Sequence, residues 1–534
     1  MQRHYSRRIL LWLSVAVFLF SSACVRAEQA QRPSDTFIRG GLEQLQSLDP
    51  LYGMDELHAS VFLDLFEGLL EISPEGKIAP AIAKSWTISA DAKTYTFSLR
   101  QTHWSNGEAI VASQFVAALL RALAPESEAA QLSMLYPIVN AEAFHKGEVT
   151  DTDLVGIQAL DDYTLRLQLH TATSHFLSVL AYRYLTPFLD GQYDYSNVDS
   201  ENLRSLPYNG PYILSSHKDK KTIDLEKNPT YWNQQQVAIP KVRYLLGTHE
   251  EQWENYKSGK LDYIQIIPSK EYEWAKENIP SEILIAPQFA TYFYELDLRY
   301  PQLQDPRVRK ALNLVINRES LADSAVQPGH LPTESIVPPH LSHYEPARPA
   351  WVTQSYEQRI HEAQTLMEDA GYKALTPLKV SLAFNTSDDH QRIAEAIVAI
   401  WQTYLPIEVE LRDFIWKDYK VGRAEMRVGM INRYGWSGDY MDPLAFLAVW
   451  LPDSPINYMG YKNPDYAELL RRASLERNTK ERYQLLQDAE AKILKDNIVL
   501  PLFHYARRSA IKQRIYDWES NTGFVLMSKH LSIQ

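Results

Sequence analysis

Alternation of apolar and polar side chains predicts short β-strands along much of the chain. In residues 94–99 every second side chain is apolar, and residues 164–170 repeat the pattern. The apolar positions are Tyr95, Phe97, Leu99, Leu165, Leu167 and Leu169. Residues 222–226 predict a further strand, which Asn228 and Pro229 end. Each segment is typical of a strand with one buried face.

Helical periodicity alternates with these strands. Residues 394–404 predict one helix, and Thr479 is the expected N-cap of another that runs to about residue 495. The apolar stripes are Ile397, Ile400 and Trp401 in the first helix and Leu486, Ala489 and Ile493 in the second. Strands and helices that alternate in this way predict an α/β fold.

Turn residues mark several boundaries between these elements. Asp305 and Pro306 have the residue types of an N-cap and a first helical position. Gly107 follows a predicted strand and suits a turn position with positive φ. Residues 337–356 contain several prolines and histidines, so we expect a long surface loop there.

The first 27 residues have the pattern of an export signal. Arg3, Arg7 and Arg8 precede a 12-residue apolar run at positions 9–20, which is too short to span a bilayer. Small residues follow the run, and no later segment is long and apolar enough to cross a membrane. We therefore expect the chain to act outside the cytoplasm, in the periplasm.

Cys24 is the single cysteine of the chain. Its position just after the apolar run resembles a lipoprotein processing site, although Ser21 stands where such sites usually have leucine. Cleavage after Ala27 is the alternative, and Arg7 and Arg8 leave a twin-arginine export route open. One cysteine excludes a disulfide within the chain and any metal site built from several cysteines.

Charge and motif content exclude other functions. The 534-residue chain has a formal net charge of −12, and without its first 27 residues it keeps 50 basic and 66 acidic side chains. This argues against nucleic acid as a partner, because phosphate binding needs a basic face. We find no G-x-S-x-G, H-E-x-x-H, P-loop or G-x-G-x-x-G pattern and no zinc-type histidine spacing. Neither an enzyme nor a bound cofactor or metal is expected.

Several segments in order resemble the dipeptide and oligopeptide substrate-binding proteins of ABC transporters, solute-binding protein family 5. The resemblance is strongest to the oligopeptide-binding branch. The segments are SLDP at 47–50, LFEGLL at 65–70, AIAKSWTISADAKTYTFSLR at 81–100, WSNGEAIVASQF at 104–115, NGPYIL, KNPTYW, YKSGKLDY, DPRVRKALNLVINRESL at 305–321, GWSGDYMDPLAFL at 435–447 and IVLPLFHYARR at 498–508. Each is weak alone, but their shared order over nearly 500 residues is specific.

The resemblance implies a two-lobed clamshell of the periplasmic-binding-protein type, class II-like, with an extra domain and discontinuous segments. Two crossing strands, near residues 289–296 and 500–506, are expected as hinges. The implied division is lobe I at 28–57, 185–289 and 505–534, the extra domain at 58–184, and lobe II at 290–504.

The resemblance also implies a peptide site. Asp439 matches an aspartate that pairs with the ligand ammonium. Gly435 and Ser437 would offer backbone groups, and Trp436 would line a side-chain pocket. Ser437 departs from close relatives, which often have cysteine there.

Cationic and aromatic positions complete the implied site. Arg433 and Arg423 match cleft arginines, and His390 matches a histidine that can pair with a ligand carboxylate. The other matched positions are Glu295, Trp416, Tyr505, Tyr136 and, aligned on QSLDP, Gln44, where close relatives have glutamate. Ser324, Ala325 and Val326 replace a lysine that can serve very short ligands, which argues against a simple dipeptide preference.

The sequence therefore predicts a non-enzymatic, monomeric binding protein that captures short peptides and delivers them to an inner-membrane ABC permease and ATPase. Since the family also contains other binders, a murein peptide, a nickel chelate or haem stays open as the ligand. An exported hydrolase is a remote alternative.

Overall fold

The computed structural model describes most of the chain after residue 34. The described residues are 35–41, 45, 47–51, 56–74, 76–127, 132–181, 185–189, 193, 195–196, 201–217, 221–324, 326, 329–339, 341, 344–438, 440–518 and 526–534. The predicted signal peptide with Cys24, and the candidate site residues Gln44 and Asp439, lie outside these residues.

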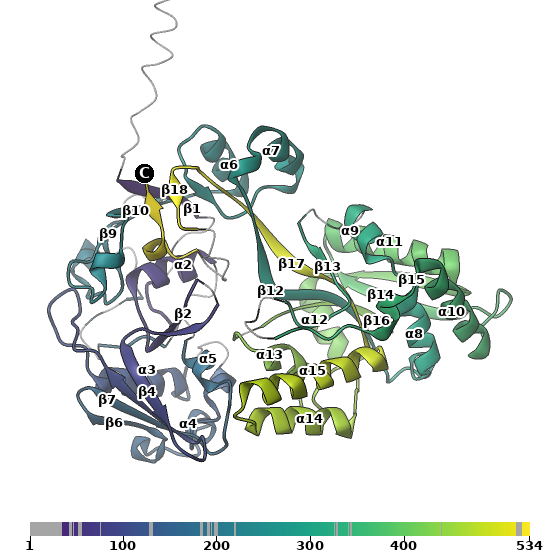
Figure 1. The fold of residues 1–534 in the computed structure, drawn as a ribbon, viewed down its shortest axis with the longest axis horizontal. Helices are drawn as coiled ribbons and strands as arrows, with labels where there is room; N and C mark the ends of the chain where they lie inside the picture. The colour runs from purple at the N-terminus through teal and green to yellow at the C-terminus, as the bar shows by residue number, and fades with distance from the viewer. Residues whose placement is uncertain are drawn as a thin grey trace, which may run out of the picture.

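One mixed sheet of eleven described strands extends through the whole molecule (Figure 1). Its order is β15-β14-β16-β12-β17-β11-β1-β10-β9-β8, and β13 also pairs with β17. The bounds are β1 Thr36–Gly41, β8 Tyr212–Ser216, β9 Thr222–Lys227, β10 Lys241–Leu246, β11 Tyr263–Ile264, β12 Ile283–Leu296, β13 Leu331–Pro332, β14 Leu378–Asn385, β15 Ile407–Phe414, β16 Ile431–Ser437 and β17 Val499–Ile511.

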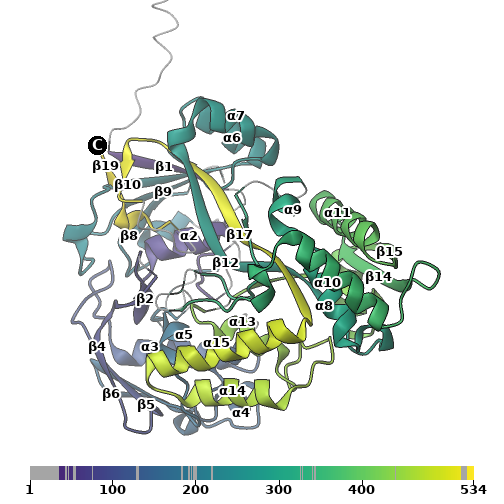
Figure 2. The same cartoon turned by 45° about the vertical axis from the view of Figure 1, so that its right-hand side comes forward.

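The long strands β12 and β17 join two bodies of the molecule. They pair antiparallel, from Ile283 opposite Ala510 at one end to Glu295 opposite Val499 at the other. The register breaks after Pro287, which has no N–H to donate to the ladder. Breaks of this kind bend a strand. Figures 1 and 2 show the ribbon of β12 and β17 passing from one body to the other.

The first body combines one end of the large sheet with a separate four-stranded sheet, β4-β5-β7-β6. One continuous apolar cluster, which includes Phe37 of β1 and Leu167 of β7, lies under both sheets. The remaining elements of this body are β2 Leu70–Ile72, β3 Ile78–Pro80, β4 Ala83–Ile88, β5 Thr94–Leu99, β6 Ile157–Asp161, β7 Thr164–Gln168, β18 Ile515–Tyr516, β19 Ser532–Ile533, α2 Glu56–Leu65, α3 Ala112–Leu123, α4 Ala141–His145, α5 Phe176–Leu180, α6 His249–Lys257 and α7 Tyr272–Asn278.

The second body packs helices against β14, β15 and β16. Two apolar clusters fill it, one around Trp401 and the other around Trp450, and both side chains are fully buried. Its helices are α8 Pro306–Leu314, α9 Arg318–Ser324, α10 Tyr356–Asp369, α11 Asp388–Tyr404, α12 Trp416–Ala424, α13 Leu444–Leu447, α14 Pro464–Leu475 and α15 Thr479–Asp496. These two bodies form the expected two-lobed α/β architecture.

Local sequence patterns predicted several elements correctly. The alternate side chains of β5 are buried, and Gly107 has a φ of 90°. The Asp305 side chain caps α8 by accepting a hydrogen bond from the Arg307 N–H. The cap of α15 was predicted one residue late, because the Asn478 side chain accepts from the N–H groups of the first turn. Thr479 is instead the first helical residue.

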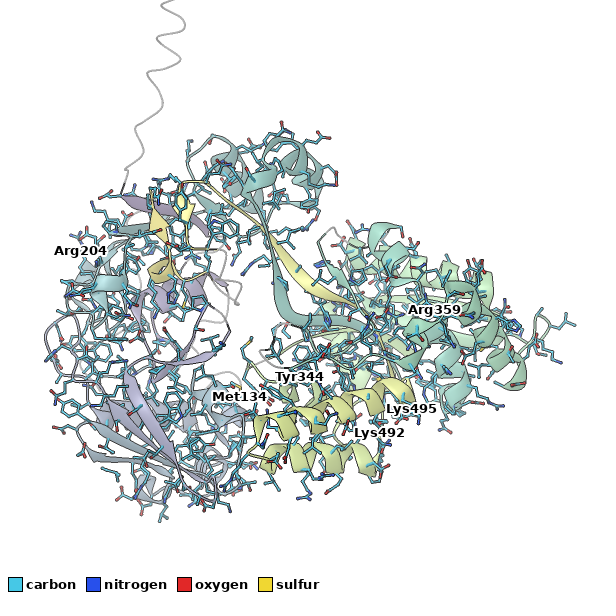
Figure 3. All side chains as sticks on the ribbon, in the orientation of Figure 1. Met134, Arg204, Tyr344, Arg359, Lys492 and Lys495 are labelled. Atoms are coloured by element: carbon cyan, nitrogen blue, oxygen red, sulfur yellow. The ribbon has the colours of Figure 1, made fainter. Side chains whose placement is uncertain are left out.

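The expectation of a surface loop at residues 337–356 is wrong for its first part. Val337 and Tyr344 are buried against the cluster around Trp450. Glu490 of α15, itself fully buried, accepts hydrogen bonds from the Val337 N–H (2.8 Å) and the Tyr344 hydroxyl (2.7 Å). Figure 3 labels Tyr344 beside α15. This anchoring carboxylate is 146 residues from Tyr344 in sequence, so no local pattern indicates it.

Within the part of the chain that the structure describes, no helix has the length and apolar character needed to cross a bilayer. The same residues contain no group of three or more histidine, cysteine or acidic side chains placed to hold a metal ion.

A buried ion pair fixes the segment that follows Gly438. Two Arg482 nitrogens of α15 each donate to one oxygen of Asp442, at 2.7 Å, and both side chains are 6% exposed. The Asp442 carboxylate also accepts from the Leu444 N–H at the start of α13. This pair therefore holds the loop between β16 and α13 against the helical layer.

We predict that Arg482→Met destabilises the protein by about 3–5 kcal/mol, because it leaves Asp442 buried without its counter-ion. Urea unfolding followed by circular dichroism measures this loss. The matched control is Arg471→Met on α14, whose pair with Glu468 is 60% and 51% exposed and should contribute nothing measurable.

The double variant Arg482→Met/Asp442→Leu removes both charges and should recover most of the lost stability. Equal losses in Arg482→Met and Arg471→Met would show that the buried pair does not hold this loop.

Candidate ligand-binding site

β16 is paired along only part of one edge. On one side it pairs with β12 over its whole length, from Ile431 opposite Leu296 to Ser437 opposite Ala290. On the other side β14 pairs only with Ile431 and Asn432. Among the described strands none pairs with residues 433–437 on that side. This stretch is therefore an open strand edge inside the molecule, where another extended chain can add.

The orientation of the backbone shows which residues face the open edge. The Tyr419 hydroxyl of α12 donates to the Arg433 carbonyl (2.6 Å), so this carbonyl points away from β12. In an antiparallel strand, one residue's N–H and C=O point to the same side, and every second residue repeats that direction. The backbone groups of Gly435 and Ser437 therefore also face the open edge.

Two glycines allow close packing along this strand and at its end. A Cβ on Gly435 would lie 3.0 Å from the Tyr505 hydroxyl oxygen, so a side chain there would press against β17. A Cβ on Gly438 would lie 2.3 Å from a ring carbon of Phe289, which no side chain can do. The Gly438 N–H donates to the Phe289 carbonyl (2.9 Å). Gly438 thus fixes where the strand ends, one residue before Asp439.

A polar cluster lies beside the open edge, and it contains three of the residues predicted from sequence. Arg433 donates to the Tyr505 hydroxyl (2.9 Å) and to Oδ1 of Asn385 (3.1 Å), and its guanidinium lies 4.7 Å from the ring centre of Tyr292. His390 Nδ1 is 3.5 Å from the Tyr292 hydroxyl. Four elements, β12, β14, β17 and α11, thus place side chains around Arg433.

The electrostatics of this cluster favour an incoming anion. Burial, and then the positive charge of Arg433, lower the pKa of His390 to about 4. His390 is therefore neutral at pH 7 and can donate or accept a hydrogen bond, while Arg433 keeps its charge. Sequence analysis did not identify Tyr292 or Asn385. Tyr292 lies in the aromatic run FATYFYEL, where every ring also suits a core position.

Glu295 and Arg423 form an ion pair beneath β16, away from this cluster. Their side chains are 1% and 3% exposed. Trp450 also donates to Glu295 (3.2 Å), and the Arg423 guanidinium lies 3.7 Å from the ring centre of Tyr434. Burial raises the pKa of Glu295, and the charge of Arg423 opposes that rise. In this conformation the pair supports β16 from below.

The remaining predicted residues are more dispersed. Trp436 donates to the Ala445 carbonyl (2.7 Å), Ser437 is exposed at the end of β16, and Trp416 is 53% exposed at the start of α12. Tyr136 lies in the first body, with its ring centre 6.1 Å from that of His145. Tyr136 is therefore not part of the cluster around Arg433 in this conformation.

A second contact between the two bodies lies next to the position of Asp439. The ring of His175, in the first body, stacks on Tyr440 with centres 4.7 Å apart. Ser174 also donates to carbonyls at the end of α14 (3.4 Å). Gly438 and Tyr440, the described residues on either side of position 439, are thus each held by a contact, and the contact of Tyr440 is with the first body.

Comparison with known proteins places this arrangement in a family. Residues 77–458 match the family described as bacterial extracellular solute-binding proteins, family 5 Middle. The periplasmic oligopeptide-binding protein OppA of Escherichia coli (strain K12) is 31% identical over 484 residues, which cover 89% of this chain and 88% of that protein.

Solved structures agree with this placement. The unliganded open form of the periplasmic murein tripeptide-binding protein MppA superposes with a TM-score of 0.85 and 28% identity, over 93% of this chain and 97% of that one. Haemophilus influenzae OppA in complex with RPPGFSPFR superposes with a TM-score of 0.70 and 27% identity, over 93% and 99%. The two bodies here are thus arranged more like the open form than like the peptide complex.

The family match extends over more than two thirds of the chain, and it includes the strand with the open edge together with Tyr292, Asn385, His390 and Arg433 of the polar cluster. The chain belongs to the bacterial extracellular solute-binding proteins of family 5.

Proposed function

We propose that this protein captures short peptides between its two lobes and delivers them to an ABC importer. The observation that carries the proposal is the open edge of β16 at residues 433–437, with a cationic cluster beside it. An extended peptide can pair its backbone with Gly435 and Ser437, as one strand pairs with another. Relatives named as oligopeptide-binding proteins support peptides as the ligand class.

The ends of the ligand need opposite charges, because an unpaired charge is costly to bury. We assign the ligand ammonium to Asp439, which directly follows Gly438. We assign the ligand carboxylate to Arg433 and His390, at the opposite end of the open stretch of β16. Trp416, Trp436 and the other predicted pocket residues would contact ligand side chains when the lobes close.

The proposal extends to the cellular setting. Relatives named as periplasmic proteins support an extracytoplasmic location. We propose export by residues 1–27, with cleavage at Cys24, and lipidation there, or after Ala27. A monomer would present the closed, peptide-bound form to a permease and ATPase and would catalyse no reaction. The lobe and extra-domain boundaries given above are part of the same proposal.

Asp439→Asn is predicted to weaken peptide binding strongly with little effect on folding. Leaving a ligand ammonium without its anion costs about 2–5 kcal/mol, or roughly 30- to 5000-fold in affinity at about 1.4 kcal/mol per decade. Isothermal titration calorimetry with one tripeptide measures this change. The N-acetylated tripeptide lacks the ammonium, so it should bind wild type poorly and lose much less in the variant.

Two results would contradict the proposal. Binding of the free-amine tripeptide to Asp439→Asn within threefold of wild type would remove Asp439 from the ammonium site. Wild-type protein that binds a nickel chelate or haem, but no peptide from a mixed tripeptide pool, would replace peptides as the ligand class.

Peptide binding should also close the lobes, since the ligand contacts both of them. We expect a smaller radius of gyration by small-angle scattering at saturating tripeptide than without ligand. The N-acetylated peptide at the same concentration is the control and should leave the curve near that of the free protein. Identical curves with and without a bound tripeptide would exclude closure about the β12–β17 ribbon.

A further inference from the structure

A recess of about 250 Å³ lies beside the cluster around Arg433, where the two bodies meet at the ribbon. At about 30 Å³ per water, it has room for roughly eight waters, or for the end of a ligand. Residues of both bodies and of both crossing strands, β12 and β17, line it. The lining residues are Ile266, Gln288, Tyr292, Val326, His330, Asp389, His390, Ile393, Phe503, Tyr505, Ala506, Arg507 and Arg508.

The charged side chains of this recess are mainly basic. β17 contributes Arg507 and Arg508, and the described lining has one acidic side chain, Asp389, which pairs with Arg392 and whose negative charge also acts on Arg508. His330 and His390 also face the recess, and burial lowers the pKa of each to about 4. At neutral pH the recess therefore has excess positive charge and two neutral imidazoles.

Local contacts fix the position of Arg508. Its Nη2 donates to the Ser269 hydroxyl (3.2 Å), and its guanidinium lies 5.3 Å from the ring centre of Tyr272. A Cβ built on Gly329 would lie 3.2 Å from Cγ of Arg508, so the loop before β13 packs on the arginine stem. Burial lowers the pKa of Arg508, while Tyr272 and Asp389 act in the opposite direction. An anion in the recess would add to this stabilisation of the charged guanidinium.

The loop before β13 is tied to the same strand. His330 Nδ1 accepts a hydrogen bond from the Ala506 N–H (2.9 Å), and its ring stacks on Phe503 with centres 4.9 Å apart. The loop includes Val326, which also lines the recess. The recess next to Arg508 is thus lined by residues of both bodies. Closure of the lobes would therefore change the size of the recess.

We propose that this recess receives a carboxylate of the bound ligand and that Arg508 is the residue that selects for it. The proposal rests on the proposed peptide function and makes it more specific. The carboxylate is either the C-terminus of a peptide long enough to pass Tyr505 or an acidic side chain at its last residue. Arg433 would hold shorter ligands, and Arg508 would extend recognition to longer ones.

The test measures the affinities of two matched peptide pairs at lengths from two to six residues. The first pair differs in a C-terminal acid or amide, and the second, both amidated, ends in Glu or Gln. A charged hydrogen bond contributes about 1.5–3 kcal/mol, so at the fitting length wild type should favour the carboxylate by roughly 10- to 150-fold.

Arg508→Met should reduce this preference to below about threefold at that length, and Arg508→Lys should keep part of it. If Arg508→Met removes the acid-to-amide preference, the carboxylate is the peptide C-terminus. If it removes the Glu-to-Gln preference, the carboxylate is the last side chain. Lys512→Met is the control, because Lys512 follows β17 and pairs with Glu282 outside the recess. It should leave both preferences unchanged.

Peptides that bind Arg508→Met with the wild-type acid-to-amide and Glu-to-Gln ratios at every length would overturn the role of Arg508 and leave the peptide function intact. A wild-type protein that binds none of these peptides would overturn both proposals.

Discussion

The rest of the structure depends on the antiparallel ribbon of β12 and β17. It is the middle of the one mixed sheet that runs through both bodies, while each body keeps its own apolar cores. The register break after Pro287 gives this ribbon a place to bend. The same two strands also place Tyr292, Tyr505 and Arg508 at the proposed site. The proposed hinge and the proposed ligand contacts are therefore parts of one element, so a ligand bound at the ribbon would favour one arrangement of the bodies.

The proposed site combines a strand edge that can pair with any backbone and charged residues that we assign to the two ends of a ligand. Backbone pairing does not depend on the ligand's side chains, so the open edge at residues 433–437 suits a range of peptide sequences. Selectivity would then come from charge: Arg433 and His390 beside the edge, Arg508 in the recess, and Asp439 after Gly438. The buried pair of Glu295 and Arg423 lies below β16, at the place where the ligand would add.

Local patterns predicted the elements that short-range chemistry determines, such as the alternating strand β5 and the Asp305 cap of α8. Shared motifs identified Arg433, His390 and Tyr505, which the fold brings together. Patterns did not reveal contacts between distant segments. Glu490 buries a loop that its prolines had suggested was exposed, and Arg508 reaches the recess only because β17 crosses between the bodies. Asp439 and Gln44 lie outside the described residues and stay predictions.

The central claim is that a peptide adds as a strand to the open edge of β16. Amide hydrogen exchange of residues 431–438, measured by NMR with and without saturating tripeptide, tests it most directly. The account predicts that the amides of Gly435 and Ser437 exchange much more slowly with peptide bound, while those of Tyr434 and Trp436, which face β12, change little. A bound tripeptide that leaves the Gly435 and Ser437 amides exchanging as in the free protein would contradict it.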